Sequence, residues 1–165
     1  METKGFLRIA SRVAADPAHE GALGAPEGQI LALLNKILTA KYAIEMSYRS
    51  FADRIKGPWR DSLVEHWQEH AKDERDSAYQ FAMKSVALGG DPILTTVQVP
   101  PCPANLGGLI RVLAEQELGA IEACRELVVL AGDNTGLRLL AEETILLDSH
   151  HLDDLRRMAV DITKE

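Results

Sequence analysis

Four stretches of the chain carry a seam of apolar residues, and near the middle of each seam stand side chains that can hold a proton or a metal ion. A carboxylate on a core-facing seam must be paired, protonated or bound to a cation, because burying a lone charge costs several kcal/mol. Such groups at one level of a helical bundle predict an interior site. They are Lys41 and Glu45, His70 and Glu74, Glu117, and Asp148 with His151.

The elements that would position these groups are four long helices. Apolar positions recur at steps of three and four over residues 27–56, 58–88, 106–131 and 135–163. Residues 1–26 show only a weak pattern that prolines and glycines interrupt, so we expect an N-terminal arm there. The remainder, residues 27–165, is expected to form one domain.

The connections between the predicted helices are short, long and short. Gly57 and Pro58 make the first connection, and the turn sequence Gly132-Asp133-Asn134 makes the third. The second connection contains DPILTTVQVPPCPAN, whose four prolines exclude a continuous helix. This order predicts an all-α four-helix bundle, built from two antiparallel hairpins that a long crossover joins.

Composition narrows the class of protein. Of the 165 residues, 46% are hydrophobic and 26% charged, which is typical of a folded globular domain and excludes a disordered chain. The formal charge of −7 argues against a nucleic-acid partner. No apolar run approaches the roughly 20 residues that span a membrane, so we expect no membrane partner and a cytoplasmic location. Two cysteines without CxxC spacing predict reduced thiols.

Over residues 29–158 the chain resembles the ferritin-like superfamily, and most closely the bacterioferritins. The resemblance lies in LNKILTAKYAIEMSY, HWQEHAKDERDSAYQFAMKSVALGGDP, LAEQELGAIEACREL and ILLDSHHLDDL, one string for each helix. It implies an iron site with one carboxylate from the first helix, one from the third, and a Glu-x-x-His pair from each of the others. Positions i and i+3 share a helix face, so one turn offers an oxygen and an imidazole to the same ion.

The match to the family's ligands is partial on three of the helices. Glu117 corresponds to the carboxylate of the third helix. Asp148 and His151 correspond to the pair on the fourth helix, with a shorter carboxylate than the usual Glu. Glu74 corresponds to the carboxylate of the second helix, but Ser77 stands where its histidine partner belongs.

The first helix departs further from the family pattern. Alignment on Tyr48 places Lys41 at the carboxylate position and Glu45 one turn later. Arg75 stands where bacterioferritins have the methionine that binds haem, so the resemblance does not imply haem. The candidate metal ligands are Glu45, Glu74, Glu117, Asp148 and His151, and the candidates for charge compensation or for surrounding positions are Lys41, Tyr48, His70 and Ser77.

These departures change the charge balance of the predicted site. Two divalent ions would neutralise four carboxylates, whereas an ammonium group from Lys41 leaves only three negative charges to be balanced. We therefore predict one tight metal position near Glu117, Asp148 and His151, and a weak or absent second one. Glu45 could complete the second position from a different turn, and His70 could replace the missing imidazole. Otherwise Lys41 would pair with Glu117 or Glu74 and fill the space of a metal ion.

Simpler interpretations remain open for each residue taken alone. Asp148 and His151 could belong to a partly solvated polar face, and Glu74 could be a surface residue, because charged residues flank it. Lys41 could reach the surface along its aliphatic stem or form a salt bridge. His70 could be exposed or lie outside the ligand shell. Only the common level of these groups in the bundle favours a site.

Three hypotheses for function follow. The first is a ferritin-like protein that binds iron or another divalent metal and oxidises ferrous iron with dioxygen or peroxide, or stores iron; it would then be a ferroxidase-type oxidoreductase. The second is a ferritin-like assembly or binding protein with a degenerate, metal-poor centre. The third is a di-metal oxidoreductase that acts on another substrate. The resemblance also implies homo-oligomers, and the short stretch after the fourth helix favours a dimer or a twelve-subunit shell over a larger cage.

Overall fold

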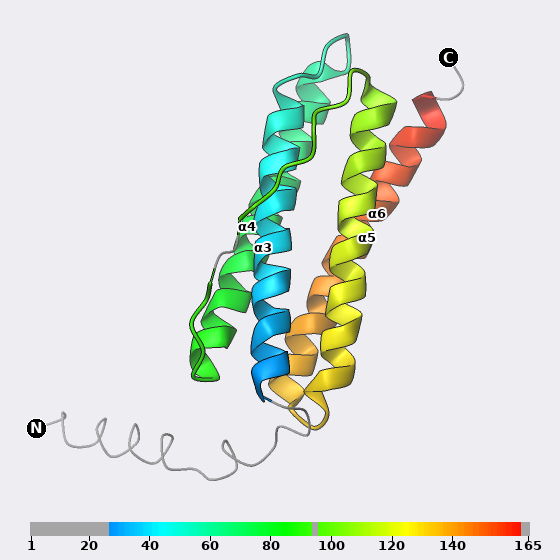
Figure 1. The fold of residues 1–165 in the computed structure, drawn as a ribbon. Helices are drawn as coiled ribbons and strands as arrows, with labels where there is room; N and C mark the ends of the chain where they lie inside the picture. Colours follow the sequence, from blue (N-terminus) through cyan, green and yellow to red (C-terminus); the bar gives the residue numbers. More distant parts are fainter. Residues whose placement is uncertain (1–26, 94–95, 163–165) are drawn as a thin grey trace, which may run out of the picture.

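The computed structural model describes residues 27–93 and 96–162, which form four long helices and no strand (Figure 1). The helices are α3 (Glu27–Ala52), α4 (Arg60–Ala87), α5 (Leu106–Ala131) and α6 (Thr135–Ile162). The prediction of an all-α four-helix bundle is confirmed. The predicted arm, residues 1–26, lies outside the described residues. None of the helices in the described ranges has the length and apolar character needed to cross a membrane.

The connection between α3 and α4 is longer than the sequence suggested. α3 ends at Ala52, earlier than expected, because the amides of Arg54 and Ile55 bond to carbonyls three residues back, at 3.0 and 3.2 Å. This tighter turn breaks the α-helical register. Gly57 then adopts a φ of 100°, which favours glycine, and α4 begins at Arg60. The two helices remain antiparallel neighbours, as predicted (Figure 1).

The other two helices begin at asparagine caps, and their predicted starts agree with the structure. The Asn105 side chain accepts a hydrogen bond from the amide of Gly108 at 2.8 Å. The Asn134 side chain accepts one from the amide of Leu137 at 3.0 Å. Each cap gives a side-chain acceptor to an amide in the first turn of a helix, and the amide of Leu137 also bonds to the carbonyl of Asn134 at 3.1 Å.

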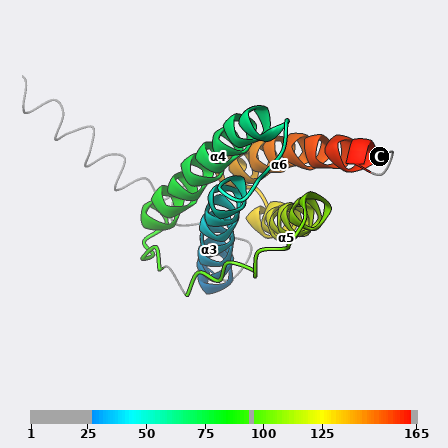
Figure 2. The same ribbon diagram turned by 90° about the horizontal axis from the view of Figure 1, so that it is seen from above.

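The crossover from α4 to α5 follows α3 along the length of the bundle (Figure 1). An asparagine on α3 holds it in place, since Asn35 donates to the carbonyl of Asp91 at 3.3 Å and accepts from the amide of Ile93 at 3.1 Å. Seen from above, α3 lies beside both α4 and α5, and α5 lies beside α6 (Figure 2). Two hairpins joined by a crossover give this arrangement.

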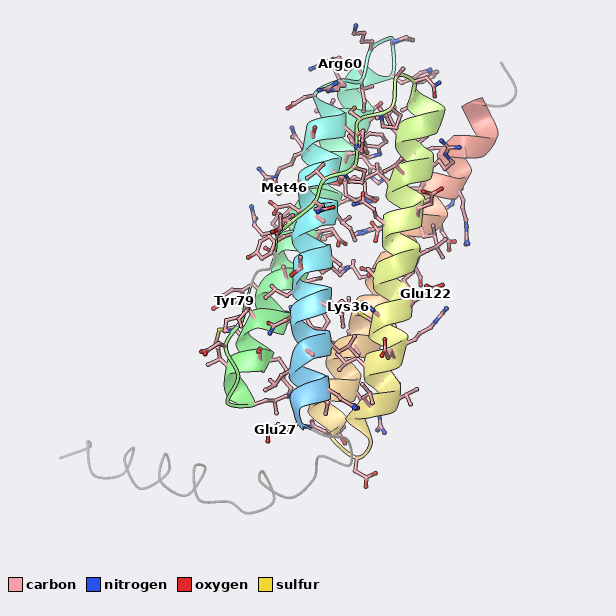
Figure 3. All side chains as sticks on the ribbon, viewed as in Figure 1. Glu27, Lys36, Met46, Arg60, Tyr79 and Glu122 are labelled. Carbon is pink, nitrogen blue, oxygen red and sulfur yellow. The ribbon has the colours of Figure 1, made fainter. Side chains whose placement is uncertain are left out.

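The interior consists of two apolar clusters with a polar layer between them. One cluster includes Ile30, Leu34, Phe81, Leu127 and Leu137, and the other includes Tyr48, Phe51, Trp67, Leu113 and Leu155. Polar side chains such as those of Lys36 and Glu122 extend outward from the bundle (Figure 3). The sequence positions that separate the two clusters on α3, α4 and α6 are those of Lys41, Glu74 and Asp148. The fold therefore brings the titratable groups of the four seams to one level.

Candidate metal centre

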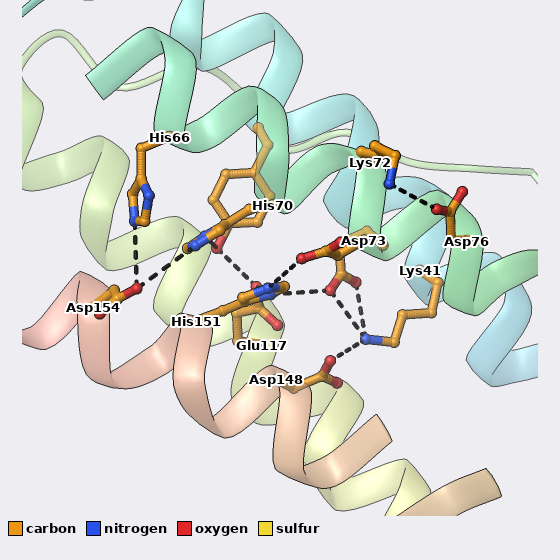
Figure 4. A network of polar contacts seen from close by, with 12 residues as sticks. Lys41, His66, His70, Lys72, Asp73, Asp76, Glu117, Asp148, His151 and Asp154 are labelled. Atoms are coloured by element: carbon orange, nitrogen blue, oxygen red, sulfur yellow. Dashed lines mark hydrogen bonds and ion pairs between the residues drawn. The ribbon is translucent and has the colours of Figure 1, made fainter. Parts of the chain in front are cut away.

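Five titratable side chains from all four helices meet in the polar layer (Figure 4). Lys41 comes from α3, Glu74 from α4, Glu117 from α5, and Asp148 and His151 from α6. All are buried, with at most 3% of any one of them exposed. Their charges must therefore be balanced by one another or by a bound ion.

Lys41 occupies a fixed place between α4 and α6. Its Nζ lies 2.9 and 3.2 Å from the two carboxylate oxygens of Glu74 and 2.5 Å from Oδ1 of Asp148. Burial would lower the pKa of the ammonium, but Glu74 and Asp148 outweigh this effect and raise the pKa above its ordinary value. The lysine is therefore a permanent cation that is held by two carboxylates.

His151 faces the other side of Glu74. Its Nδ1 lies 3.3 Å from Oε1 of Glu74 and 3.3 Å from Oε1 of Glu117, yet it makes a well-directed hydrogen bond with neither. On the far side of the ring, Nε2 lies 3.5 Å from Oδ2 of Asp73. Burial would lower the pKa of His151, but Glu117 and Glu74 outweigh it and raise the pKa to about 10. Without a metal ion, the imidazole is thus protonated at neutral pH.

The three buried carboxylates differ in how readily they ionise. Burial would raise the pKa of Glu74, but the charge of Lys41 holds it below its ordinary value. Burial and the charge of Glu74 raise the pKa of Glu117. Burial raises the pKa of Asp148 to about 7, although Lys41 partly opposes the shift. The centre therefore contains one firmly ionised carboxylate and two that retain a proton more readily than usual.

Tyr48 and His70 form a chain that leads from Glu117 toward the surface of α4. The Tyr48 hydroxyl donates to Oε1 of Glu117 at 2.7 Å, and Nδ1 of His70 lies 3.3 Å from the hydroxyl oxygen. Burial and Glu117 raise the pKa of Tyr48 well above its ordinary value, so the phenol keeps its proton. Burial and the neighbouring His151 and His66 lower the pKa of His70 to about 3, so its ring is neutral.

Four of these groups suit a metal ion. Ligand atoms of Glu74, Glu117, Asp148 and His151 lie within 4.8 Å of one another. Ligands about 2 Å from a shared ion come within roughly 4 Å of each other, so small adjustments would suffice. Three buried atoms of this set lack a hydrogen-bond partner: Oε2 of Glu117, Oδ2 of Asp148 and Nδ1 of His151. Carboxylate oxygens with one imidazole suit a divalent transition metal.

The structure separates the predicted ligands into two groups. Glu74, Glu117, Asp148 and His151 come together, whereas Glu45 does not join them. Its carboxylate lies 3.1 Å from the guanidinium of Arg49, toward the edge of the bundle. The residues predicted for surrounding positions, namely Lys41, Tyr48, His70 and Ser77, are all buried.

Three residues near the centre were missed in the sequence. Asp73 contacts His151, and Asp154 lies near both His66 and His70. Asp73 directly precedes a seam residue and looked like part of a solvated face. His66 stands four residues before His70, on the same helix face, and this i, i+4 pair was a usable signal.

Comparisons with known proteins agree with the fold. A family model described as a ferritin-like domain matches residues 31–164. A ferritin-like, diiron-carboxylate protein from Bacillus anthracis strain Ames superposes with a TM-score of 0.77 and 21% identity, over 81% of this chain and 96% of that one. The bacterioferritin-related protein from Bacteroides fragilis, a dodecameric thioferritin, gives a TM-score of 0.79 and 20% identity, over 88% and 92%. A search of curated proteins found no significant sequence match.

Proposed function

The chain belongs to the ferritin-like domain family, and on that premise we propose that it binds iron, with one ion in each bundle instead of two. The observation that carries the proposal is the position of Lys41. Its ammonium contacts both oxygens of Glu74 and one oxygen of Asp148. A cation is thus already built into one half of the centre, and the other half keeps unpaired ligand atoms.

The ion would be held by Nδ1 of His151 and by the carboxylates of Glu74 and Glu117. The Oε1 atom of each carboxylate lies 3.3 Å from this nitrogen. Asp148 adds a further oxygen, since its Oδ2 has no partner. Oδ2 of Asp73 lies 3.5 Å from Nε2 of His151, so its charge favours a proton on that nitrogen and leaves Nδ1 to bind metal. Binding at Nδ1 displaces a proton from His151, so the ion replaces the positive charge that the imidazolium supplies without it.

The number of ions limits the chemistry. Iron in this position would supply one ferrous–ferric couple, and one ferrous ion gives up one electron. Reduction of dioxygen to hydrogen peroxide takes two electrons and two protons, so a single bundle cannot complete it with its own ion. We therefore expect ferrous oxidation to be slow relative to that of a two-metal centre, and iron binding to be the primary property.

Metal content tests the proposal directly. The purified protein is stripped with a chelator, loaded anaerobically with ferrous iron, and passed over a desalting column before iron and protein are measured. We expect one ion per chain within the group formed by Glu74, Glu117, Asp148 and His151. Two ions within this group would contradict the role given to Lys41. Crystals grown with iron would locate the ion by anomalous scattering.

The variant Lys41→Glu sharpens the test. It places a carboxylate at the position that holds the ammonium, and we expect the metal content to exceed that of the parent by up to one ion per chain. Lys36→Glu is the matched control, because Lys36 lies on the same helix with 66% of its side chain exposed. Its metal content should stay unchanged. If Lys41→Glu binds no more iron than the parent, Lys41 is not what excludes the second ion.

A second candidate function rests on the same lysine. Lys41 and protonated His151 balance two of the three buried carboxylates without any metal. The raised pKa values of Glu117 and Asp148 let one of these two carboxyl groups keep its proton. The protein would then be a ferritin-like assembly or binding protein with a metal-poor centre. If the iron-loaded parent protein at neutral pH shows no iron among Glu74, Glu117, Asp148 and His151, the result favours this candidate and rejects the first.

We also propose that the protein forms a homo-oligomer built from dimers. The dodecameric state of the bacterioferritin-related protein supports this proposal, since that protein shares the fold over most of both chains. Light scattering coupled to size exclusion tests it against the mass of 18.1 kDa expected for a single chain.

A further inference from the structure

A second group of ligand atoms lies beside the buried centre, nearer the surface (Figure 4). His66 and His70 stand four residues apart on α4, so they share a face. Their Nε2 atoms lie 3.4 and 3.8 Å from the same oxygen of Asp154 on α6. One ligand atom from each of the three residues falls within 4.8 Å of the others.

The hydrogen bonds of Tyr48 fix which nitrogen of His70 is free. A phenol has one proton, and Tyr48 donates it to Glu117. The oxygen of Tyr48 can therefore only accept from His70, so the proton of His70 sits on Nδ1. Nε2 is then the ring nitrogen that can bind a metal, and it lies 3.8 Å from Oδ2 of Asp154.

Asp154 is oriented toward the two histidines. Its Oδ1 lies 3.5 Å from the guanidinium of Arg157, whereas Oδ2 faces His66 and His70. The side chains of His66 and Asp154 are 34% and 29% exposed, while that of His70 is 6% exposed. A cation from solvent could therefore reach this group without passing through the bundle interior, and water could complete its coordination.

We propose that His66, His70 and Asp154 form a second metal site, which takes a divalent transition cation of the zinc or ferrous class. Two imidazoles and one carboxylate suit such an ion, and three protein ligands leave room for water. A cation there would lie among Nε2 of His66, Nε2 of His70 and Oδ2 of Asp154. Tyr48 and Glu117 would orient His70 from the other side of its ring, as outer hydrogen-bond partners orient histidine ligands in metal sites.

The site is independent of the proposed iron centre. It shares no ligand with Glu74, Glu117, Asp148 and His151, although His70 stacks on His151 with ring centroids 3.9 Å apart. The competing explanation is a plain contact between His66 and Asp154 in which a proton on His66 is donated to the carboxylate. That contact would bind no metal.

Zinc is the probe that tests the site. Crystals of the full chain are soaked with zinc chloride, and data are collected on both sides of the zinc absorption edge. We expect an anomalous peak among His66, His70 and Asp154. Absence of a peak there would overturn the proposal. The same map shows whether a metal binds at Glu117 and His151, and that result tests the proposed iron centre alone. Either proposal can therefore be rejected without the other.

Solution binding adds variants that leave the core intact. His66→Ala and Asp154→Asn change partly exposed side chains, and we expect each to weaken zinc binding at this site by at least about tenfold in isothermal titration calorimetry. His150→Ala is the control, because His150 is an exposed histidine on α6 outside both ligand groups. Unchanged titrations for His66→Ala and Asp154→Asn would overturn the proposal.

Discussion

At the scale of single residues, His151 makes the metal-free protein sensitive to alkaline pH. Its pKa is about 10 in the folded protein, against 6.5 for an unperturbed histidine. The folded state therefore holds this proton more tightly than the unfolded state does. The stability that results is fully present below about pH 6.5 and is lost as the pH rises toward 10, and it amounts to a few kcal/mol.

The other buried groups leave a window in which His151 acts alone. The raised pKa of Asp148, about 7, and the lowered pKa of His70, about 3, affect stability only below about pH 7. Burial raises the pKa of the Cys124 thiol from 9.0 to about 12, so Cys124 affects stability above about pH 8.5. The raised pKa values of Lys41 and Tyr48 act above about pH 10. Between pH 7 and about 8.5, with a chelator present, we expect the free energy of unfolding in urea to fall through His151.

The variant His151→Gln should flatten this dependence, because it removes the group that titrates. The parent and the variant are compared by urea unfolding at several pH values between 7 and about 8.5, below the range in which Cys124 contributes. His150→Gln on the same helix should keep the slope of the parent. A slope that persists in His151→Gln would assign the effect to another group.

Helical periodicity predicted the position of some site residues and not of others. The common level of Glu74, Glu117 and Asp148 followed from helical periodicity, since each lies on the apolar seam of its helix. The same stepping put Glu45 on a seam, but 100° per residue turns it about 40° from Lys41, toward the edge. There it meets Arg49. Periodicity has too little angular resolution to separate the edge of a face from its centre.

The partners of Lys41 were only half predictable. The sequence suggested Glu117 or Glu74, and the structure has Glu74 together with Asp148. Which carboxylate an ammonium reaches depends on a few ångströms of packing between α3 and α6, two helices that are distant in sequence. The local pattern contains no information on that distance.

At the scale of the helices, caps and turns explain why some bounds were predictable. α5 and α6 start directly after asparagines whose side chains accept amide protons. Asparagine before an apolar seam is a recognisable start signal. The end of α3 has no such marker before Gly57, and the tighter turn at residues 53–55 depends on hydrogen bonds that the pattern does not specify.

The contribution of the Asn134 cap of α6 to the stability of the protein can be measured. We expect Asn134→Ala to lower the free energy of unfolding by about 1 kcal/mol, because the amide of Leu137 loses its side-chain acceptor and keeps only the backbone carbonyl of residue 134. Asp133→Ala is the matched control, since Asp133 is the exposed neighbour in the same turn. Chemical unfolding of both variants checks the difference. Equal losses would mean that the cap contributes nothing beyond a general effect of alanine in this turn.

At the scale of the whole molecule, the long crossover was the most informative feature of the sequence. Two hairpins of equal helices could pair in several ways, and only a long link lets α5 start at the end of the bundle where α3 ends (Figure 1). The prolines predicted a link that is not a helix. Its path along α3, which Asn35 fixes by bonding to Asp91 and Ile93, could not be deduced from them.

The outer face of α4 carries an apolar stripe that a single bundle leaves exposed. Tyr79, Met83 and Val86 follow one another by four and three residues and are 62, 51 and 54% exposed. An apolar stripe of this kind on a charged helix is typical of an interface. If the protein forms the homo-oligomer proposed above, this stripe is where we expect a second copy to pack.

A charge placed in that stripe tests the assembly. We expect Met83→Glu to weaken association by at least about tenfold, because the carboxylate would be desolvated between two copies. Dilution series in analytical ultracentrifugation measure the change. Gln68→Glu introduces the same side chain at an exposed position near the other end of α4 and should leave association unchanged. If Met83→Glu associates as tightly as the parent, the copies meet through another face, because a buried unpaired carboxylate could not be without effect.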